Sequence, residues 1–111
     1  MLTMSNRGQS LIKLRAKIFK ALSDPVRLQI LEYIRPKEKC VCEITPHLKL
    51  AQPLISRHLK ILKGCGLVKE RKDGNRRLYS VTERKLFRII DDLNPELIEA
   101  LSKKMIEQIV S

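Results

Sequence analysis

The sequence predicts a mainly α-helical fold with one small β-hairpin, and three observations support this. Apolar residues recur at helical spacing through most of the 111 residues, which indicates amphipathic helices. Asp73 and Gly74 lie between two extended runs, which is a strong hairpin signal. The length fits a single domain, residues 1–111, whose modest core would gain from a partner subunit that covers its apolar faces.

Two helices are predicted in the N-terminal third. Apolar residues at helical spacing place the first at about residues 10–22. Asp24 and Pro25 then supply an N-cap and a favoured first-turn proline, so a second helix begins there and ends near Arg35. Residues 37–39 are expected to form a short charged connector.

A helix-turn-helix is predicted over about residues 42–64. In its first helix Pro46 is expected to be tolerated because it falls within the first turn. The second helix follows Ala51, which cannot cap it as Ser or Thr would, and ends at Gly64. In such a motif the second helix enters the major groove of DNA.

A basic hairpin follows, over about residues 67–81. Its two extended runs flank the turn at Gly74, and cations gather at its tip. A basic hairpin after a helix-turn-helix is a wing, suited to phosphates or a minor groove. Two last helices are predicted over about residues 83–110, with Thr82 as the expected cap of the first and Asn94-Pro95 as the restart.

The positive charge is concentrated in two parts of the chain: the N-terminal third, and the second helix of the predicted motif (the recognition helix) together with the wing. Of the formal net charge of +11, residues 52–77 carry eight cations and two acidic residues. An ordinary solvated face is the alternative explanation, but such faces usually mix signs. Arg and Gln can bond bidentately to base edges, and Lys neutralises phosphate. The donors opposite the apolar side of the recognition helix are Gln52, Ser56, Arg57, Lys60 and Lys63.

Three other classes of function fit the sequence less well than a DNA-binding regulator does. An RNA-binding module is disfavoured because the four aromatic residues fall mostly at core-like positions. An enzyme is disfavoured because no His, Cys and carboxylate cluster has the spacing of a nucleophile or metal site. A winged helix that binds only proteins is the most serious alternative, and salt-dependent duplex binding would separate it from a DNA regulator.

The compartment is expected to be the cytoplasm, with no membrane partner. No apolar run approaches the roughly 18 residues of a membrane span, and the polar start is not a signal peptide. Three cysteines in such a chain favour reduced thiols, although a transient or sensing disulfide stays open.

Four blocks of the sequence carry a family resemblance: AKIFKALSDPVRLQILEYI, CVCEI, LAQPLISRHLKILKGCGLV and RKDGNRRLYSV. Together, over roughly residues 14–93, they resemble the ArsR/SmtB family of winged-helix repressors. The resemblance implies a homodimer that binds an inverted-repeat operator and leaves it when an inducer binds. It also implies dimerisation through the first helix and the helix after the wing, whose apolar stripes agree. The expected dimerisation helices are about residues 10–22 and 83–110, and the last of them either adds to the dimer interface or caps the core.

The resemblance assigns DNA contacts position by position. The expected phosphate contacts of the recognition helix are Lys60 and Lys63, and His58 and Cys65 are expected to pack on the apolar flank. The expected groove residues are Gln52, Pro53, Ser56 and Arg57, and the expected wing contacts are Arg71, Lys72, Asn75, Arg76 and Arg77.

A candidate sensing site lies at Cys40 and Cys42. Arsenic-sensing members carry a C-x-C-x-x-C set here, and this chain has Thr45 at the third position. Thiols at i and i+2 diverge on a regular helix, so joint binding of a soft metal or metalloid requires extended or unwound backbone. Thiol redox or persulfide sensing, and no sensing at all, are the alternatives. No cofactor is expected to be required.

A second family site uses His and carboxylates for zinc on the helix after the wing. This chain has Asp91 and Asp92 there but no His, so zinc is not expected at that place. His47 is expected to be an exposed helix residue.

Overall fold

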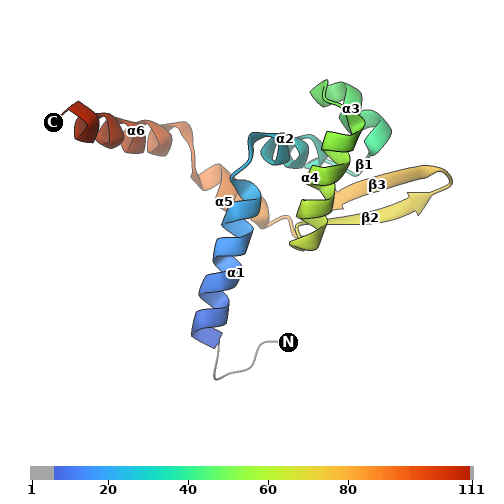
Figure 1. Ribbon diagram of the computed structural model, residues 1–111, viewed down its shortest axis with the longest axis horizontal. Coiled ribbons are helices and arrows are strands. Elements are labelled where there is room, and N and C mark those ends of the chain that lie inside the picture. The colour runs from blue at the N-terminus through green and yellow to red at the C-terminus, as the bar shows by residue number, and fades with distance from the viewer. Residues whose placement is uncertain (1–6, 111) are drawn as a thin grey trace.

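The computed structural model describes residues 7–110 and has the architecture of a winged helix-turn-helix (Figure 1). The helix-turn-helix and the sheet form a body, from which the hairpin projects on one side and α6 on the other, while α1 extends away separately. The elements are α1 (Arg7–Leu22), α2 (Pro25–Ile34), β1 (Lys39–Cys40), α3 (Val41–Leu48), α4 (Gln52–Gly64), β2 (Val68–Asp73), β3 (Arg76–Val81), α5 (Leu86–Asp92) and α6 (Pro95–Val110).

The helix starts at α2 and α4 confirm the sequence prediction. Asp24 caps α2, since its Oδ1 accepts hydrogen bonds from the amides of Val26 at 2.8 Å and Arg27 at 3.2 Å. Ala51 precedes α4 with extended backbone and no side-chain cap. Between the two helices of the motif, Lys49 ends α3 with a φ of +57°, a conformation that costs a non-glycine residue free energy.

Two details of the helix starts differ from the prediction. Pro46 lies inside α3, past its first turn, because the helix already begins at Val41. Its missing N–H leaves one helical bond of this short helix unmade. Thr82 does not cap the next helix: its hydroxyl donates to the carbonyl of Gly66 at 2.5 Å, which closes the base of the hairpin, and α5 starts only at Leu86.

The strands in the described residues form one antiparallel sheet of order β1-β3-β2. The hairpin has the expected place, and Asp73 pairs with Arg76 across a turn at Gly74, whose φ is +62°. The expected charged connector of residues 37–39 is wrong at its end, because Lys39 and Cys40 form strand β1 and pair with β3. A strand of two residues carries no alternation that a sequence pattern could reveal.

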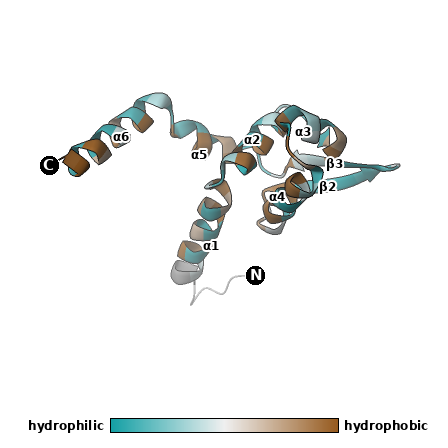
Figure 2. Cartoon of the chain, turned by 45° about the horizontal axis from the view of Figure 1, so that its top comes forward, coloured by the Kyte–Doolittle hydropathy of each residue, from teal (hydrophilic) through white to brown (hydrophobic). Residues whose placement is uncertain are grey.

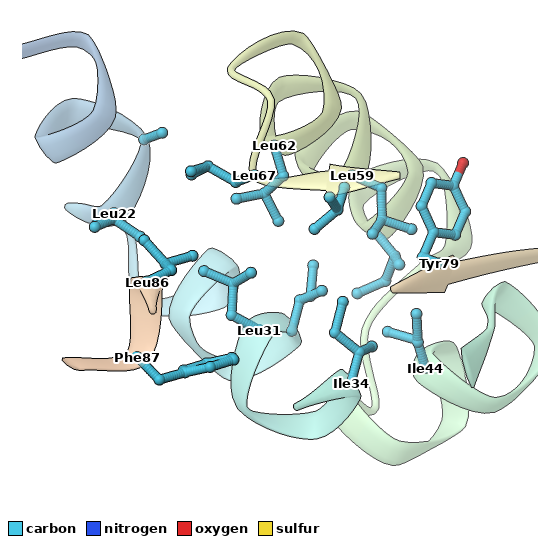
Figure 3. Packing of buried hydrophobic residues seen from close by; sticks show 14 residues of the cluster. Leu22, Leu31, Ile34, Ile44, Leu59, Leu62, Leu67, Tyr79, Leu86 and Phe87 are labelled. Atoms are coloured by element: carbon cyan, nitrogen blue, oxygen red, sulfur yellow. The ribbon is translucent and has the colours of Figure 1, made fainter. Parts of the chain in front are cut away.

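The core joins all layers of the body. Figure 3 shows side chains from α1 to α5 and the sheet converging on one cluster. The predicted apolar face of α4 is buried in it through Ile55, Leu59 and Leu62. Full burial of each such side chain contributes about 1.5–3 kcal/mol of transfer free energy, so the core fixes which face of α4 stays outside.

The apolar stripes of α1 and α6 are exposed (Figure 2). No residue of α6 is buried by the described part of the chain. The exposed stripe residues are Leu11, Ile12, Leu14 and Phe19 on α1, and Leu97, Ile98, Leu101, Met105, Ile106, Ile109 and Val110 on α6.

Ala51→Ser is expected to raise the free energy of unfolding by about 1 kcal/mol, because a serine at this N-cap accepts a bond from an unpaired amide of the first turn of α4. Urea unfolding followed by circular dichroism measures it. Asp24→Ala is the mirror control and should lose a similar amount at the capped start of α2. An unchanged midpoint for Ala51→Ser would contradict the expected cost of the missing cap.

Candidate nucleic-acid interface

The outer face of α4 carries polar and charged side chains. Gln52, Ser56, Arg57 and Lys60 are all exposed, and they lie opposite the buried apolar face of the helix. Pro53 is exposed beside them. Burial therefore leaves these predicted groove and phosphate residues free to contact a duplex.

A cleft of about 750 Å³ lies between α4 and the wing. The cleft places Cys40 and Cys42 next to several of the predicted DNA contacts. The sequence did not predict this proximity. One wall is formed by Gln52, Ser56, Lys60 and Lys63, the other by Asn75, Arg76 and Arg77, and the remaining lining by Cys40, Val41, Cys42, Thr45, Pro46, Glu70 and Tyr79. Of the predicted contacts, Pro53, Arg57, Arg71 and Lys72 lie outside this lining.

Several cations of the wing are already paired within the chain. Arg71 binds Glu38 through two nitrogens, Arg76 lies 3.5 Å from Glu43, and Arg77 lies 4.0 Å from Glu70. Lys63 also approaches Glu70, at 3.5 Å. Among the described residues, the predicted cationic contacts that form no ion pair are Arg57, Lys60 and Lys72.

The sequence analysis did not predict the acidic partners of these cations, Glu38, Glu43 and Glu70. Two of them come 33 positions before their arginines, so no local pattern links the pairs. The hydrogen bond from Arg71 holds the pKa of Glu38 below its usual value. These carboxylates offset part of the positive charge of the wing arginines, although pairs as exposed as these contribute little to stability.

Glu70 and Tyr79 form a polar contact on adjacent strands. The Tyr79 hydroxyl donates a hydrogen bond to Glu70, and this bond lowers the pKa of Glu70 although burial opposes it. Burial and the same carboxylate raise the pKa of Tyr79 to about 12. An anion is thereby held inside a cleft whose other charged side chains are cations.

His58 is a packed residue, as predicted. It is 8% exposed, and its Nδ1 lies 3.1 Å from a guanidinium nitrogen of Arg27 and 3.9 Å from Asp24. Arg27 in turn donates to the carbonyl of Ala21 at 2.6 Å. Cys65 is half-buried against the core. Neither residue faces the cleft.

Cys40 and Cys42 converge at the start of α3. Cys40 is extended, with φ −80° and ψ 157°, and its Sγ accepts a hydrogen bond from the amide of Cys42 at 2.9 Å. This is the non-helical backbone that joint use of both sulfurs requires. The two Sγ atoms lie against each other, with the Cα atoms 5.1 Å apart, so the fold brings both sulfurs to one place. Cys40 is 1% exposed, whereas Cys42 is exposed.

The carboxylate Asp91 is engaged in a structural contact. Both of its oxygens accept bonds from Arg35, at 2.9 and 2.5 Å, and this lowers the pKa of Asp91. The Arg35 guanidinium also lies 4.3 Å from the ring centroid of Phe87. Arg35, at the C-terminal end of α2, therefore links α5 to α2.

His47 is exposed and stacks on Tyr33, with ring centroids 3.8 Å apart.

Comparison with known proteins identifies the family. The model of the bacterial regulatory proteins of the arsR family matches residues 24–70. An uncharacterized HTH-type transcriptional regulator of Methanocaldococcus jannaschii is 43% identical over 82 residues, which cover 70% of this chain and 92% of that protein. The arsenical resistance operon repressor of Staphylococcus aureus is 42% identical over 77 residues, covering 69% and 74%. The chain belongs to the ArsR/SmtB family.

A solved structure is similar to this chain over nearly its whole length. The homodimeric winged helix-turn-helix DNA-binding domain of Mycobacterium bovis, a possible ArsR-family regulator, is 28% identical with a TM-score of 0.72. The match covers 97% of this chain and 95% of that one. The predicted fold class and family are confirmed. The protein is an ArsR-family DNA-binding transcriptional repressor and not an enzyme. Every helix within residues 7–110 is too short or too polar to cross a bilayer.

Proposed function

We propose that this ArsR-family protein is a homodimer that binds an inverted-repeat operator and leaves it when a thiol-directed inducer, a soft metal or metalloid, reaches Cys40 and Cys42. The observation that carries the proposal is the convergence of both sulfurs at the first turn of α3. That turn belongs to the helix-turn-helix motif, which positions α4. It directly follows strand β1, which pairs with β3 of the wing.

Operator recognition is assigned to α4 and the wing. Gln52, Ser56 and Arg57 are the side chains we assign to base edges in the major groove, because they are exposed and carry the required donors and acceptors. Lys60, Lys63 and the wing contacts Arg71, Lys72, Asn75, Arg76 and Arg77 would bind phosphates or the adjacent minor groove. The paired arginines must exchange a carboxylate for a phosphate to do so.

The homodimer is supported by the exposed stripes on α1 and α6. These helices also differ in charge: α1, residues 7–22, contains five basic and no acidic residues, whereas α6, residues 95–110, contains three acidic and two basic residues. Opposite charge favours contact between α1 of one protomer and α6 of the other over contact between two copies of α1. A two-fold axis would present two recognition helices to two half-sites of an operator.

The donor set at the sensing site limits the inducer. No group of three His, Cys, Asp or Glu side chains that could hold a metal ion occurs among the described residues, so a three-sulfur arsenite site does not fit. The third family position is Thr45, whose buried hydroxyl oxygen has no hydrogen-bond partner there. We therefore infer an inducer bound by two thiolates, with any further ligand supplied by oxygen or by the inducer itself.

Binding at the two sulfurs would disturb three connected elements. The Cys40 sulfur caps α3, and the backbone amide of Cys40 donates a hydrogen bond to the Glu43 carboxylate at 3.1 Å. Glu43 contacts Arg76 of the wing, and Cys40 pairs with Leu78 in the sheet. A ligand that draws the sulfur away from its cap would move the start of α3 and the base of the wing together.

Thiol redox sensing is the second candidate. It is favoured by the proximity of the two sulfurs, since a neighbouring resolving thiol is typical of redox-sensitive pairs. A thiol oxidant would join the two sulfurs in a disulfide and itself be reduced, whereas a bound metal would keep them apart. The two inducer classes can therefore be told apart by the state of the cysteines in the protein released from DNA.

Arg57→Ala is expected to weaken operator binding by about 1–3 kcal/mol and to relax the preference at one base position, because Arg57 is exposed and has no ion pair among the described residues. Binding is measured by fluorescence anisotropy against a set of single-base operator variants. Arg71→Ala is the control and should cost less, because Arg71 must first leave Glu38. Unchanged affinity for Arg57→Ala would remove Arg57 from the groove.

Leu101→Glu is expected to convert the dimer into a monomer, because it places a charge in the exposed stripe of α6. Sedimentation equilibrium measures the mass, and operator affinity should fall with it. Lys103→Glu, on the same helix but outside the stripe, should remain a dimer. A monomeric wild-type protein at working concentration would contradict the homodimer.

Cys40→Ser and Cys42→Ser are each expected to abolish inducer-dependent release, because a two-thiolate site needs both sulfurs. The operator complex is titrated with arsenite, antimonite, cadmium, lead, zinc and a thiol oxidant. Cys65→Ser should release DNA like the wild type, since Cys65 lies outside the cleft. If both Cys40 and Cys42 variants still respond, the sensor lies elsewhere.

A further inference from the structure

We propose that the sensing thiol Cys42 and a phosphate of the DNA backbone occupy the same cleft, so that a ligand on Cys42 excludes DNA directly. Cys42 lies in the cleft between α4 and the wing, together with the α4 side chains Gln52, Ser56 and Lys60. The inference rests on the proposed operator-binding mode and adds where the inducer acts.

The arrangement of the two walls determines what crosses the cleft. One wall is the side of α4 that carries Gln52 and Lys60, and the other is the wing at Asn75 and Arg76. A recognition helix in the major groove and a wing in the next minor groove are separated by one sugar-phosphate strand of the duplex. That strand must therefore pass over the space between the walls.

The charges of the cleft fit a phosphate. Lys60, Lys63, Arg76 and Arg77 line it from both sides, and Glu70 is the one acidic residue of the lining. Glu70 is partly neutralised by Lys63 and Arg77, at 3.5 and 4.0 Å. The excess positive charge would attract the anionic backbone.

The two cysteines differ in their access to the cleft. Cys42 is exposed, whereas Cys40 is 1% exposed and caps α3 behind it. A reagent, metal or oxidant that enters the cleft meets Cys42 first. A small reduced thiol leaves room for the backbone, while an adduct on Cys42 takes up volume between the same walls.

Direct exclusion and a change of shape make different predictions. If the adduct acts only by distorting α3, Cys42 stays reachable while DNA is bound. If adduct and phosphate share the cleft, bound DNA must shield Cys42 from reagents. Cys65 provides an internal reference, because it is a half-buried free thiol outside the cleft.

The test compares alkylation rates in the free protein and in the operator complex. The full chain is reduced with a phosphine, which is then removed, and iodoacetamide is added. In the reaction the thiolate sulfur bonds to the methylene carbon, iodide leaves with the electron pair, and the thiol proton has already passed to solvent. Mass spectrometry of peptides follows each cysteine separately.

Saturating operator is expected to slow modification of Cys42 at least tenfold and to leave the rate at Cys65 unchanged. An equal rate at Cys42 in the free and bound protein would overturn the inference. If the reduced protein binds no duplex, the proposed function fails, and this inference fails with it.

A size series gives an independent readout. Cys42→Phe fills the cleft permanently, so it is expected to bind operator at least tenfold more weakly than Cys42→Ala. Thermal unfolding of both variants shows whether α3 has kept its stability. Equal operator affinity for two folded variants would overturn direct exclusion.

Discussion

The pairing of Cys40 with Leu78 is the contact on which the rest of the arrangement depends. It places one residue at the junction of the sheet, the core and α3. Cys40 is at once a strand residue, the N-cap of α3 and a buried side chain. Because α3 packs on α4 and β3 forms half of the hairpin, this position links the recognition helix to the wing, in addition to the direct contact between α4 and β2. A change in its sulfur cannot stay local, since a buried cap has no free space in which to relax.

The charged side chains of the wing and of α4 differ in whether they are already paired within the chain. The wing arginines are held by carboxylates in the free protein, so part of their attraction to phosphate is offset by the pairs they must break. Arg57 and Lys60 on α4 need no such exchange within the described residues. In the proposed binding mode, sequence preference would therefore depend mainly on α4, while the wing would add affinity that salt screens. The pairs also keep the wing in a defined position before DNA arrives, which lowers the ordering cost of binding.

The sequence predicted what depends on local patterns and missed what depends on contacts far along the chain. The exposed face of α4, the hairpin at Gly74 and the cap at Asp24 follow from spacing and side-chain chemistry over a few residues. Strand β1 was missed because its partner lies nearly forty positions away. Thr82 was expected to cap a helix, but the fold brings the Gly66 carbonyl nearer to it. The cleft itself could not be predicted, because it exists only once α3, α4 and the wing have packed.

In the proposed homodimer, the exposed stripe of α6 would couple folding to dimerisation. This helix of 16 residues has an apolar stripe but buries none of it within the described chain. Most of the stability of a helix in a protein comes from packing of its amphipathic face, so α6 gains stability from a surface that covers its stripe. In the proposed homodimer, the exposed apolar side of α1 on a second copy would provide that surface, with charges of the opposite sign. The two recognition helices would then be held at a fixed separation only in the dimer, and operator binding and dimer formation would stabilise each other by mass action.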